Sequence, residues 1–151
     1  MSGYTFKKLS KQGHMGVIDN AEDIKKILLN MSGNAAGENI NIGIDMETKA
    51  VYYNVNPVLM GIEEPTKYLD DDHLKLVKDI MIYYNINDWQ QFYEEQGNSE
   101  VIDGFGWSLV IEGKDMLVEK HLGAGMKKSE VTPPGFDEFT KIVLKLAEST
   151  H

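Results

Sequence analysis

The stretch NINIGIDM, residues 39–46, alternates apolar and polar residues without a break. Side chains that alternate in this way point to opposite faces of an extended chain, so the stretch predicts a β-strand with one buried face. A turn is expected at residues 47–49, and alternation resumes over residues 51–55. We therefore predict a β-hairpin that stops at Pro57, because proline cannot donate a hydrogen bond to the ladder.

Upstream of this hairpin we predict a first strand over residues 4–9 and a loop over residues 12–16. Asp19 and Glu22 have capping-box spacing, and an apolar stripe at helical period follows them. This pattern predicts a helix from Asp19 to about Met31. Gly33 is the expected stop, since glycine accepts the conformation that ends helices.

Downstream, Asp70 is a natural N-cap for a helix whose apolar stripe runs to Tyr84. Asn87 is predicted to begin a short second helix that ends before Gly97. A second hairpin is expected over residues 107–118, closed by the glycine-rich loop at residues 123–125. Pro133 and Pro134 are typical of a first helical turn, so a last helix is predicted to open there.

Two hairpins, an N-terminal strand and intervening helices indicate the α+β class. We expect a mainly antiparallel sheet with the helices packed on one face. The chain has 151 residues, the size of one ordinary domain, and no linker is evident. The whole of 1–151 is therefore predicted to be a single domain.

Charge and composition exclude several functions. The chain carries 15 Lys and Arg against 24 Asp and Glu, for a net charge of −9, and all its basic residues are lysine. Without arginine or a basic patch, binding to nucleic acid or to an anionic membrane is disfavoured. Cysteine is absent, which removes thiolate chemistry and fits a reducing compartment. We expect a cytoplasmic protein with no cofactor and no metal.

The acidity is concentrated in residues 60–103, which hold eleven acids and three lysines. The same segment carries several aromatic residues, which are favoured anchors at interfaces. We predict a non-catalytic interaction protein, of an inhibitor or immunity type, that binds a partner with a basic surface. The proposed contact residues are Trp89, Tyr93, Glu94, Glu95, Glu100 and Asp103. The plainer interpretation is a solvated acidic face over a buried aromatic core.

Other hypotheses stay open. The first is a small enzyme or ligand-binding domain with its site near His121 and the Gly123-Ala124-Gly125 loop, or near His14. Asp70-Asp71-Asp72-His73 offers oxygen ligands for a cation, but consecutive residues at a helix start are more typical of capping. A second alternative is a structural homo-oligomer, in which the aromatic segment pairs with a second copy. No complete catalytic motif is present, so enzymatic activity is the less favoured alternative.

The last third of the chain resembles a group of small bacterial proteins. The resemblance lies in Asp103-Gly104-Phe105-Gly106-Trp107, which leads into a strand, in Gly123 after the hairpin, and in the Pro134-to-Phe139 segment that opens the last helix. It implies an α+β fold and a bacterial source, and it implies no activity.

Overall fold

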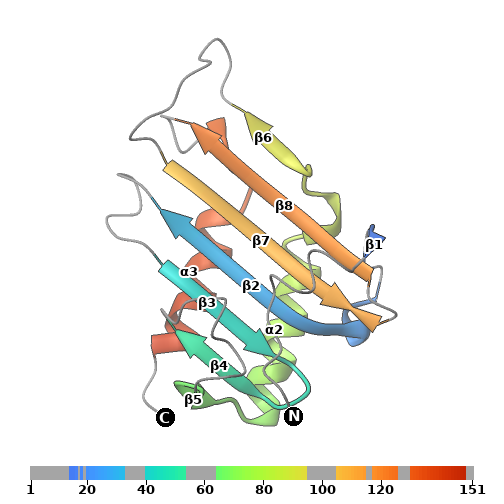
Figure 1. Ribbon diagram of the computed structural model, residues 1–151, viewed down its shortest axis with the longest axis vertical. Coiled ribbons are helices and arrows are strands. Elements are labelled where there is room, and N and C mark those ends of the chain that lie inside the picture. The colour runs from blue at the N-terminus through green and yellow to red at the C-terminus, as the bar shows by residue number, and fades with distance from the viewer. Residues whose placement is uncertain are drawn as a thin grey trace.

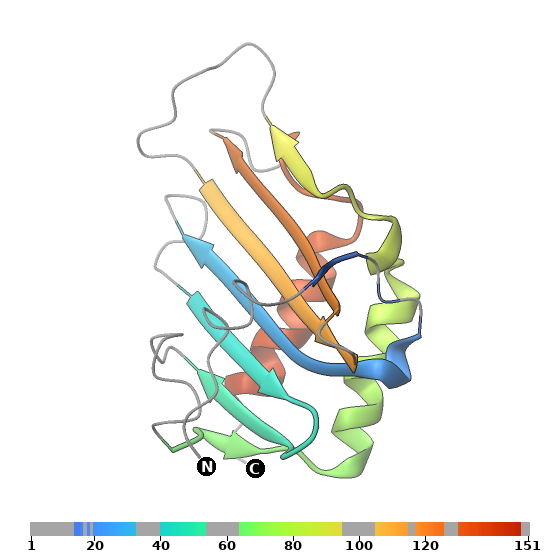
Figure 2. The same ribbon diagram turned by 45° about the vertical axis from the view of Figure 1, so that its right-hand side comes forward.

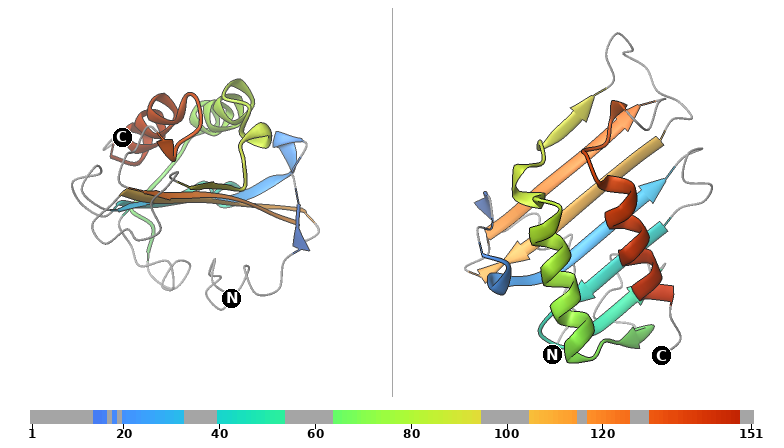
Figure 3. Two further views of the ribbon diagram at one scale, coloured as in Figure 1. Left: turned by 90° about the horizontal axis from the view of Figure 1, so that it is seen from above. Right: turned by 180° about the vertical axis from the view of Figure 1, so that it is seen from behind.

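The computed structural model describes residues 14–16, 18, 20–32, 40–53, 64–94, 105–114, 117–125 and 130–148. Within these residues one sheet of eight strands carries two α-helices, and both helices lie on the same face (Figures 1, 2 and 3). The strands are β1 (His14–Met15), β2 (Ile24–Ser32), β3 (Ile40–Asp45), β4 (Ala50–Tyr53), β5 (Lys67–Tyr68), β6 (Phe92–Glu94), β7 (Phe105–Gly113) and β8 (Leu117–Gly125). The α-helices are α2 (Asp71–Tyr83) and α3 (Phe136–Glu148), and two short 3₁₀ turns are η1 (Ala21–Asp23) and η3 (Ile86–Asp88).

The sheet is mostly antiparallel, with β2 near its centre. β2 pairs with β3 on one side and with β7 on the other. β4 and β5 extend the sheet beyond β3, and β8 extends it beyond β7. β1 and β6 both pair in parallel with β8, at different places along it (Figure 1). The predicted class, an α+β fold with a mainly antiparallel sheet and helices on one face, is confirmed.

Several predicted elements are present with small changes of boundary. The 39–46 strand and its partner are the β3–β4 hairpin, and the 107–118 hairpin is part of β7–β8. α2 begins after Asp70, whose side chain accepts a hydrogen bond from the backbone N–H of His73. α3 begins at Phe136, shortly after the two prolines. The expected 4–9 strand lies outside the described residues.

The predicted helix from Asp19 to Met31 is wrong, because residues 24–32 form the strand β2. Ile27, Leu29 and Met31 face the helices and belong to the main core, while Leu28 is buried on the opposite face. A central strand that is buried on both faces has a near-continuous apolar run, which fits a helical stripe as well as an alternating pattern. Pairing with strands on both sides makes this segment a strand, and the local sequence pattern gives no information about that pairing.

Two smaller predictions are also wrong. The expected loop at residues 12–16 contains β1, and the expected helix from Asn87 is instead η3 followed by β6. In both places a short segment is held extended by backbone pairing with β8. Gly16 N donates to Val118 O at 2.9 Å, and Leu122 N donates to Gln91 O at 3.0 Å.

Trp107 joins the sheet to the start of α3. Its indole Nε1 donates to Val131 O at 2.7 Å, and its ring centroid lies 4.7 Å from that of Phe136. Gly123 lies beside Trp107 in β8, and a Cβ at this glycine would be 2.2 Å from Val131 O and 2.5 Å from Trp107 Nε1. The glycine is therefore required by close approach, since any side chain would displace the hydrogen bond.

Gly123→Ala is expected to reduce the free energy of unfolding by about 2–3 kcal/mol, near the upper end of the cost of overpacking a core. The matched control is Gly106→Ala on β7, where the nearest atom to a Cβ would be Ser32 Oγ at 3.7 Å. The control is expected to stay within about 0.5 kcal/mol of the unmodified protein. Urea unfolding measures both variants, and equal losses in the two would contradict the assignment.

Candidate functional site

An open groove lies where α2 ends and α3 begins. Its volume is about 420 Å³, and it is called the aromatic groove below. The lining residues are Tyr83, Tyr84, Asn85, Asp88, Trp89, Tyr93, Pro134 and Gly135. Four of these eight residues are aromatic and one is a carboxylate, so the groove combines apolar area with negative charge.

Asn85 sets the shape of this groove. Its φ of 51° and ψ of 50° place it in the left-handed region, which asparagine tolerates better than most residues. The chain therefore leaves α2 after Tyr84 and turns back through η3. The indole Nε1 of Trp89 donates to Tyr84 O at 3.1 Å, which fixes the two aromatic residues on either side of the turn.

The aromatic side chains differ in exposure. Tyr83 is 76% exposed and forms the rim, whereas Trp89 is 7% exposed and forms the floor. Trp89 also packs edge-on against Trp107 at 6.0 Å and against Phe139 at 5.5 Å. The floor is thus continuous with the core, which makes it rigid, while the rim is free to meet solvent.

The hydroxyl groups of two groove residues, Tyr84 and Tyr93, are constrained by their surroundings. Burial raises the pKa of Tyr84 above its ordinary value of 10.0, and the nearby Glu138 and Tyr83 raise it further. A tyrosine is already protonated at neutral pH, and this shift favours the neutral, hydrogen-bond-donating phenol further. The hydroxyl of Tyr93 accepts from Gln90 N at 2.9 Å, which holds that ring beside Trp107.

The structure brings together two of the residues predicted to contact a partner. Trp89 and Tyr93 both line the aromatic groove. Trp89 is not on a helix as expected, and it is largely buried, so it offers a limited contact surface. The backbone of Glu94 belongs to β6, while Glu95, Glu100 and Asp103 lie outside the described residues. Asp88 was missed, although it falls in the acidic aromatic segment.

A second cluster of ionisable groups is buried at the edge of the sheet. Glu119 and His121, two residues apart on β8, have side chains 2% and 4% exposed, and Oε2 of the first lies 2.5 Å from Nε2 of the second. Glu119 Oε1 accepts from Ile18 N at 2.8 Å, and His121 Nδ1 faces Gln90 O at 2.9 Å. Through these hydrogen bonds the Glu119–His121 pair holds two segments against β8, namely the segment after β1 and the segment before β6.

These contacts bear on the hypothesis of a site at His121. A carbonyl only accepts, so the proton on Nδ1 is committed to Gln90 O, and one proton lies between Nε2 and Oε2. Both ring nitrogens are engaged, which leaves no nitrogen free to act as a general base. Glu119 also lines a cavity of about 250 Å³ beneath η1 and η3. The expected glycine loop at 123–125 is wrong, since these residues are the end of β8.

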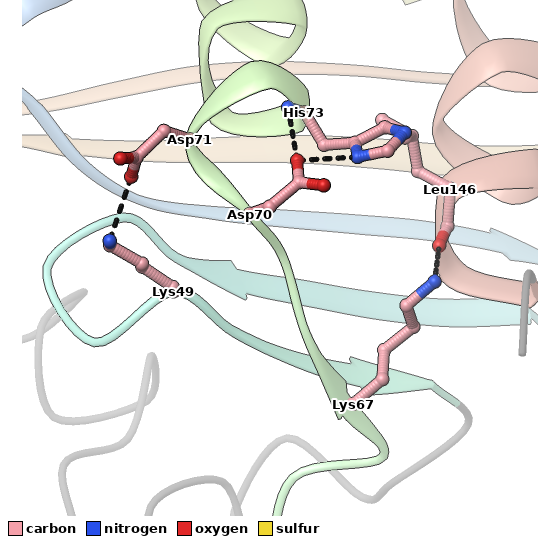
Figure 4. Close-up of polar contacts among 6 residues, drawn as sticks. All are labelled: Lys49, Lys67, Asp70, Asp71, His73 and Leu146. Carbon is pink, nitrogen blue, oxygen red and sulfur yellow. Dashed lines mark hydrogen bonds and ion pairs between the residues drawn. The ribbon is translucent and has the colours of Figure 1, made fainter. Parts of the chain in front are cut away.

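The Asp70-to-His73 cluster acts as a helix cap (Figure 4). Asp70 Oδ1 accepts from His73 N at 2.8 Å and lies 2.6 Å from His73 Nδ1, while Asp71 pairs with Lys49 at 2.7 Å. The neighbouring carboxylates thus point to different partners and do not converge. Among the described residues, no group of three or more His, Cys, Asp or Glu side chains could hold a metal ion.

Comparison with known proteins finds no matching family model, no matching curated protein and no matching solved structure. The resemblance to small bacterial proteins therefore stays a prediction. Three of its motif positions nevertheless meet in space, because Trp107 lies beside Gly123 and packs on Phe136. Neither α2 nor α3 is long and apolar enough to cross a bilayer.

Two substitutions of Glu119 distinguish the contribution of its hydrogen bonds to stability from that of its charge. Glu119→Gln can still accept from Ile18 N and can donate its amide to neutral His121, so a loss below about 1 kcal/mol is expected. Glu119→Ala leaves Ile18 N and His121 without partners and is expected to cost about 3 kcal/mol or more. Urea unfolding measures the stability of both variants. Faster hydrogen exchange at Leu122 N in the alanine variant would show that the segment before β6 is held less firmly against β8. Equal losses of stability in the two variants would contradict this role of the Glu119 hydrogen bonds.

The cap at Asp70 predicts a pH dependence. The hydrogen bonds from the backbone and ring of His73 hold the pKa of Asp70 below its ordinary value of 3.8. Because the folded-state pKa is lowered, this stabilisation is present above about pH 4 and is lost as the pH falls through the folded-state value. Asp70→Ala is expected to lower Tm by roughly 2–4 °C at neutral pH. Asp70→Asn keeps a capping oxygen and is expected to lose less Tm than the unmodified protein between about pH 5 and pH 2.

Proposed function

We propose that this protein is a non-catalytic binding protein whose aromatic groove takes a basic segment of another protein. The observation that carries the proposal is the lining of one open groove by four aromatic side chains and Asp88. A Lys or Arg side chain gains from the face of an aromatic ring, by about 0.5–2 kcal/mol, and from a nearby carboxylate. The groove offers both within a single site.

Charge at longer range supports the same partner. Six of the eight residues that line the groove belong to residues 60–103, where eleven acids outweigh three lysines. A field of this sign speeds the approach of a basic partner and penalises an acidic one. Glu95, Glu100 and Asp103 belong to the proposal through this field.

The rigid floor and exposed rim also support binding. Trp89 is held by the core, whereas Tyr83 is exposed at the edge. Interfaces commonly combine a preformed apolar floor with accessible aromatic anchors, because little side-chain freedom is lost on binding.

The proposal includes a cytoplasmic location, which the absence of cysteine supports.

Selection of peptides from a random displayed library tests the proposal without a known partner. We expect enrichment of peptides that carry Lys or Arg next to an apolar residue. Binding of a selected peptide is expected to weaken when salt rises from about 50 to about 500 mM. Tyr83→Ala is expected to weaken it roughly fivefold to tenfold, and Asp88→Lys is expected to weaken it further.

Matched controls lie outside the groove. Tyr68 is 65% exposed on β5, so Tyr68→Ala removes a comparable ring, and Asp79→Lys makes the same charge change on α2. Tyr68→Ala is expected to bind the peptide normally. Asp79→Lys weakens the acidic field but leaves the groove intact, so it is expected to lose less affinity than Asp88→Lys. Selected peptides without cationic residues, or binding that Tyr83→Ala leaves unchanged, would contradict the proposal. A dimer detected by light scattering and abolished by Tyr83→Ala would assign the groove to a second copy of the chain.

A further inference from the structure

The strand β6 lies at one edge of the sheet and has a neighbouring strand on one side. Figure 1 shows β6 beside β8, and among the described residues β8 is the strand with which it pairs. Leu122 N donates to Gln91 O at 3.0 Å, so the carbonyl of Gln91 points toward β8. Because the C=O and N–H of a trans peptide bond point in opposite directions, the N–H of Phe92 points away from β8. It therefore lies on the side of β6 where no described strand pairs, which is called the open edge below.

The residues of β6 give this open edge little protection against a further strand. Proteins commonly keep sheet edges unpaired with lysine side chains or with proline. The strand at the opposite end of the sheet, β5, carries Lys67, whereas β6 consists of Phe92, Tyr93 and Glu94. Aromatic residues favour the extended conformation, and Phe92 is 47% exposed. The strand β6 is therefore better suited than β5 to accept a strand from another molecule.

The two faces of β6 differ in the side chains that they would offer to an added strand. On the face that carries the helices, Tyr93 lines the aromatic groove, which also contains the exposed residue Asp88. None of the eight groove residues is basic. Side chains alternate along a strand, so Phe92 lies on the opposite face. The first face favours cationic side chains, and the second favours apolar side chains.

We propose that the partner binds by strand addition, as an extended segment in which Lys or Arg alternates with apolar residues. Its backbone pairs with the open edge at Phe92, its cationic side chains lie at the aromatic groove, and its apolar side chains cover the Phe92 ring. In this mode of binding, backbone hydrogen bonds supply affinity and alternate side chains supply specificity. Strand addition rests on the proposed function, because it specifies how the basic segment lies against the groove.

The hexapeptide Lys-Val-Lys-Val-Lys-Val, acetylated and amidated at its ends, tests the mode of binding. In an added strand all its lysine N–H groups point to one side and all its valine N–H groups point to the other. One form is N-methylated at the second lysine, and another at the second valine. One of the two is expected to bind about tenfold more weakly than the unmethylated hexapeptide, and the other within about twofold of it. NMR titration of the full chain measures all three peptides, and equal affinities of the two methylated forms would overturn the proposal.

Hydrogen exchange at Phe92 N tests whether the open edge is available. We expect fast exchange in the free protein and exchange about tenfold slower or more with saturating hexapeptide, because a hydrogen bond protects an amide from solvent. Leu122 N, which donates to Gln91 O, is the internal control and is expected to be protected in both states. If Phe92 N exchanges as slowly as Leu122 N in the free protein, another part of the chain or a second copy already occupies the edge, and the proposal is overturned.

Two variants at one position separate the backbone from the ring. Phe92→Ala removes the exposed ring and keeps the N–H, whereas Phe92→Pro removes both, on the side where proline is tolerated in an edge strand. We expect Phe92→Pro to bind the hexapeptide about fivefold more weakly than Phe92→Ala does. Circular dichroism checks that each variant folds, and equal binding by the two folded variants would overturn the proposal. If Phe92→Pro does not fold, the N-methylated peptides decide between the outcomes.

The outcomes for strand addition differ from those for the proposed function. Hexapeptide binding that weakens in Tyr83→Ala, but is the same for both N-methylated forms, would overturn strand addition and leave the aromatic groove as the binding site. The absence of hexapeptide binding would also overturn strand addition. Enrichment of basic peptides from the displayed library would then still support the aromatic groove.

Discussion

The buried indole of Trp107 sets the constraint on which the rest of the molecule depends. Its N–H must find an acceptor inside the core, and it finds Val131 O, 24 residues later in the chain. This hydrogen bond ties the segment after β8 to the sheet, and it requires a glycine at position 123 because no Cβ fits between the two groups. Phe136 then packs on the same ring, so α3 starts at a fixed place. The floor of the aromatic groove, Trp89, packs on the same indole. A single hydrogen bond thus links the position of a helix to the shape of a candidate site.

Local patterns in the sequence predict the parts of the fold in which neighbours in sequence are also neighbours in space. The β3–β4 hairpin, the Asp70 cap of α2 and the β7–β8 hairpin follow from alternation, turn residues and capping spacing. The strand β2 does not, because its identity depends on two flanking strands, one of which lies more than seventy residues away. The strand β6 is also set by distant pairing, since Phe92 faces Leu122. In both strands, pairing with distant parts of the chain overrides the local secondary-structure propensity.

The candidate sites were predictable to different degrees. Acidic and aromatic residues crowd into one segment, which was enough to predict a contact surface there and to select Trp89 and Tyr93. Their meeting with Pro134 and Gly135 in one groove depends on the path of the chain after Asn85, which a single sequence does not reveal. Glu119 is different, because it lies two residues from His121 in the segment that continues the predicted 107–118 hairpin up to the glycines at 123–125. Such spacing puts both side chains on one face, and that signal was available in the sequence.

The central pairing of the sheet has a consequence for how the chain is made. Residues 24–32 of β2 pair with residues 106–113 of β7. A ribosome synthesises a chain from its N-terminus, so β2 leaves the ribosome well before its partner exists. During that interval its run of Ile27, Leu28 and Leu29 has only the β3 side of its ladder available. Pairings between distant residues are slow to form because a long loop must close first. The sheet is therefore completed late in synthesis, and until then the apolar side chains of β2 lack the partner strand β7.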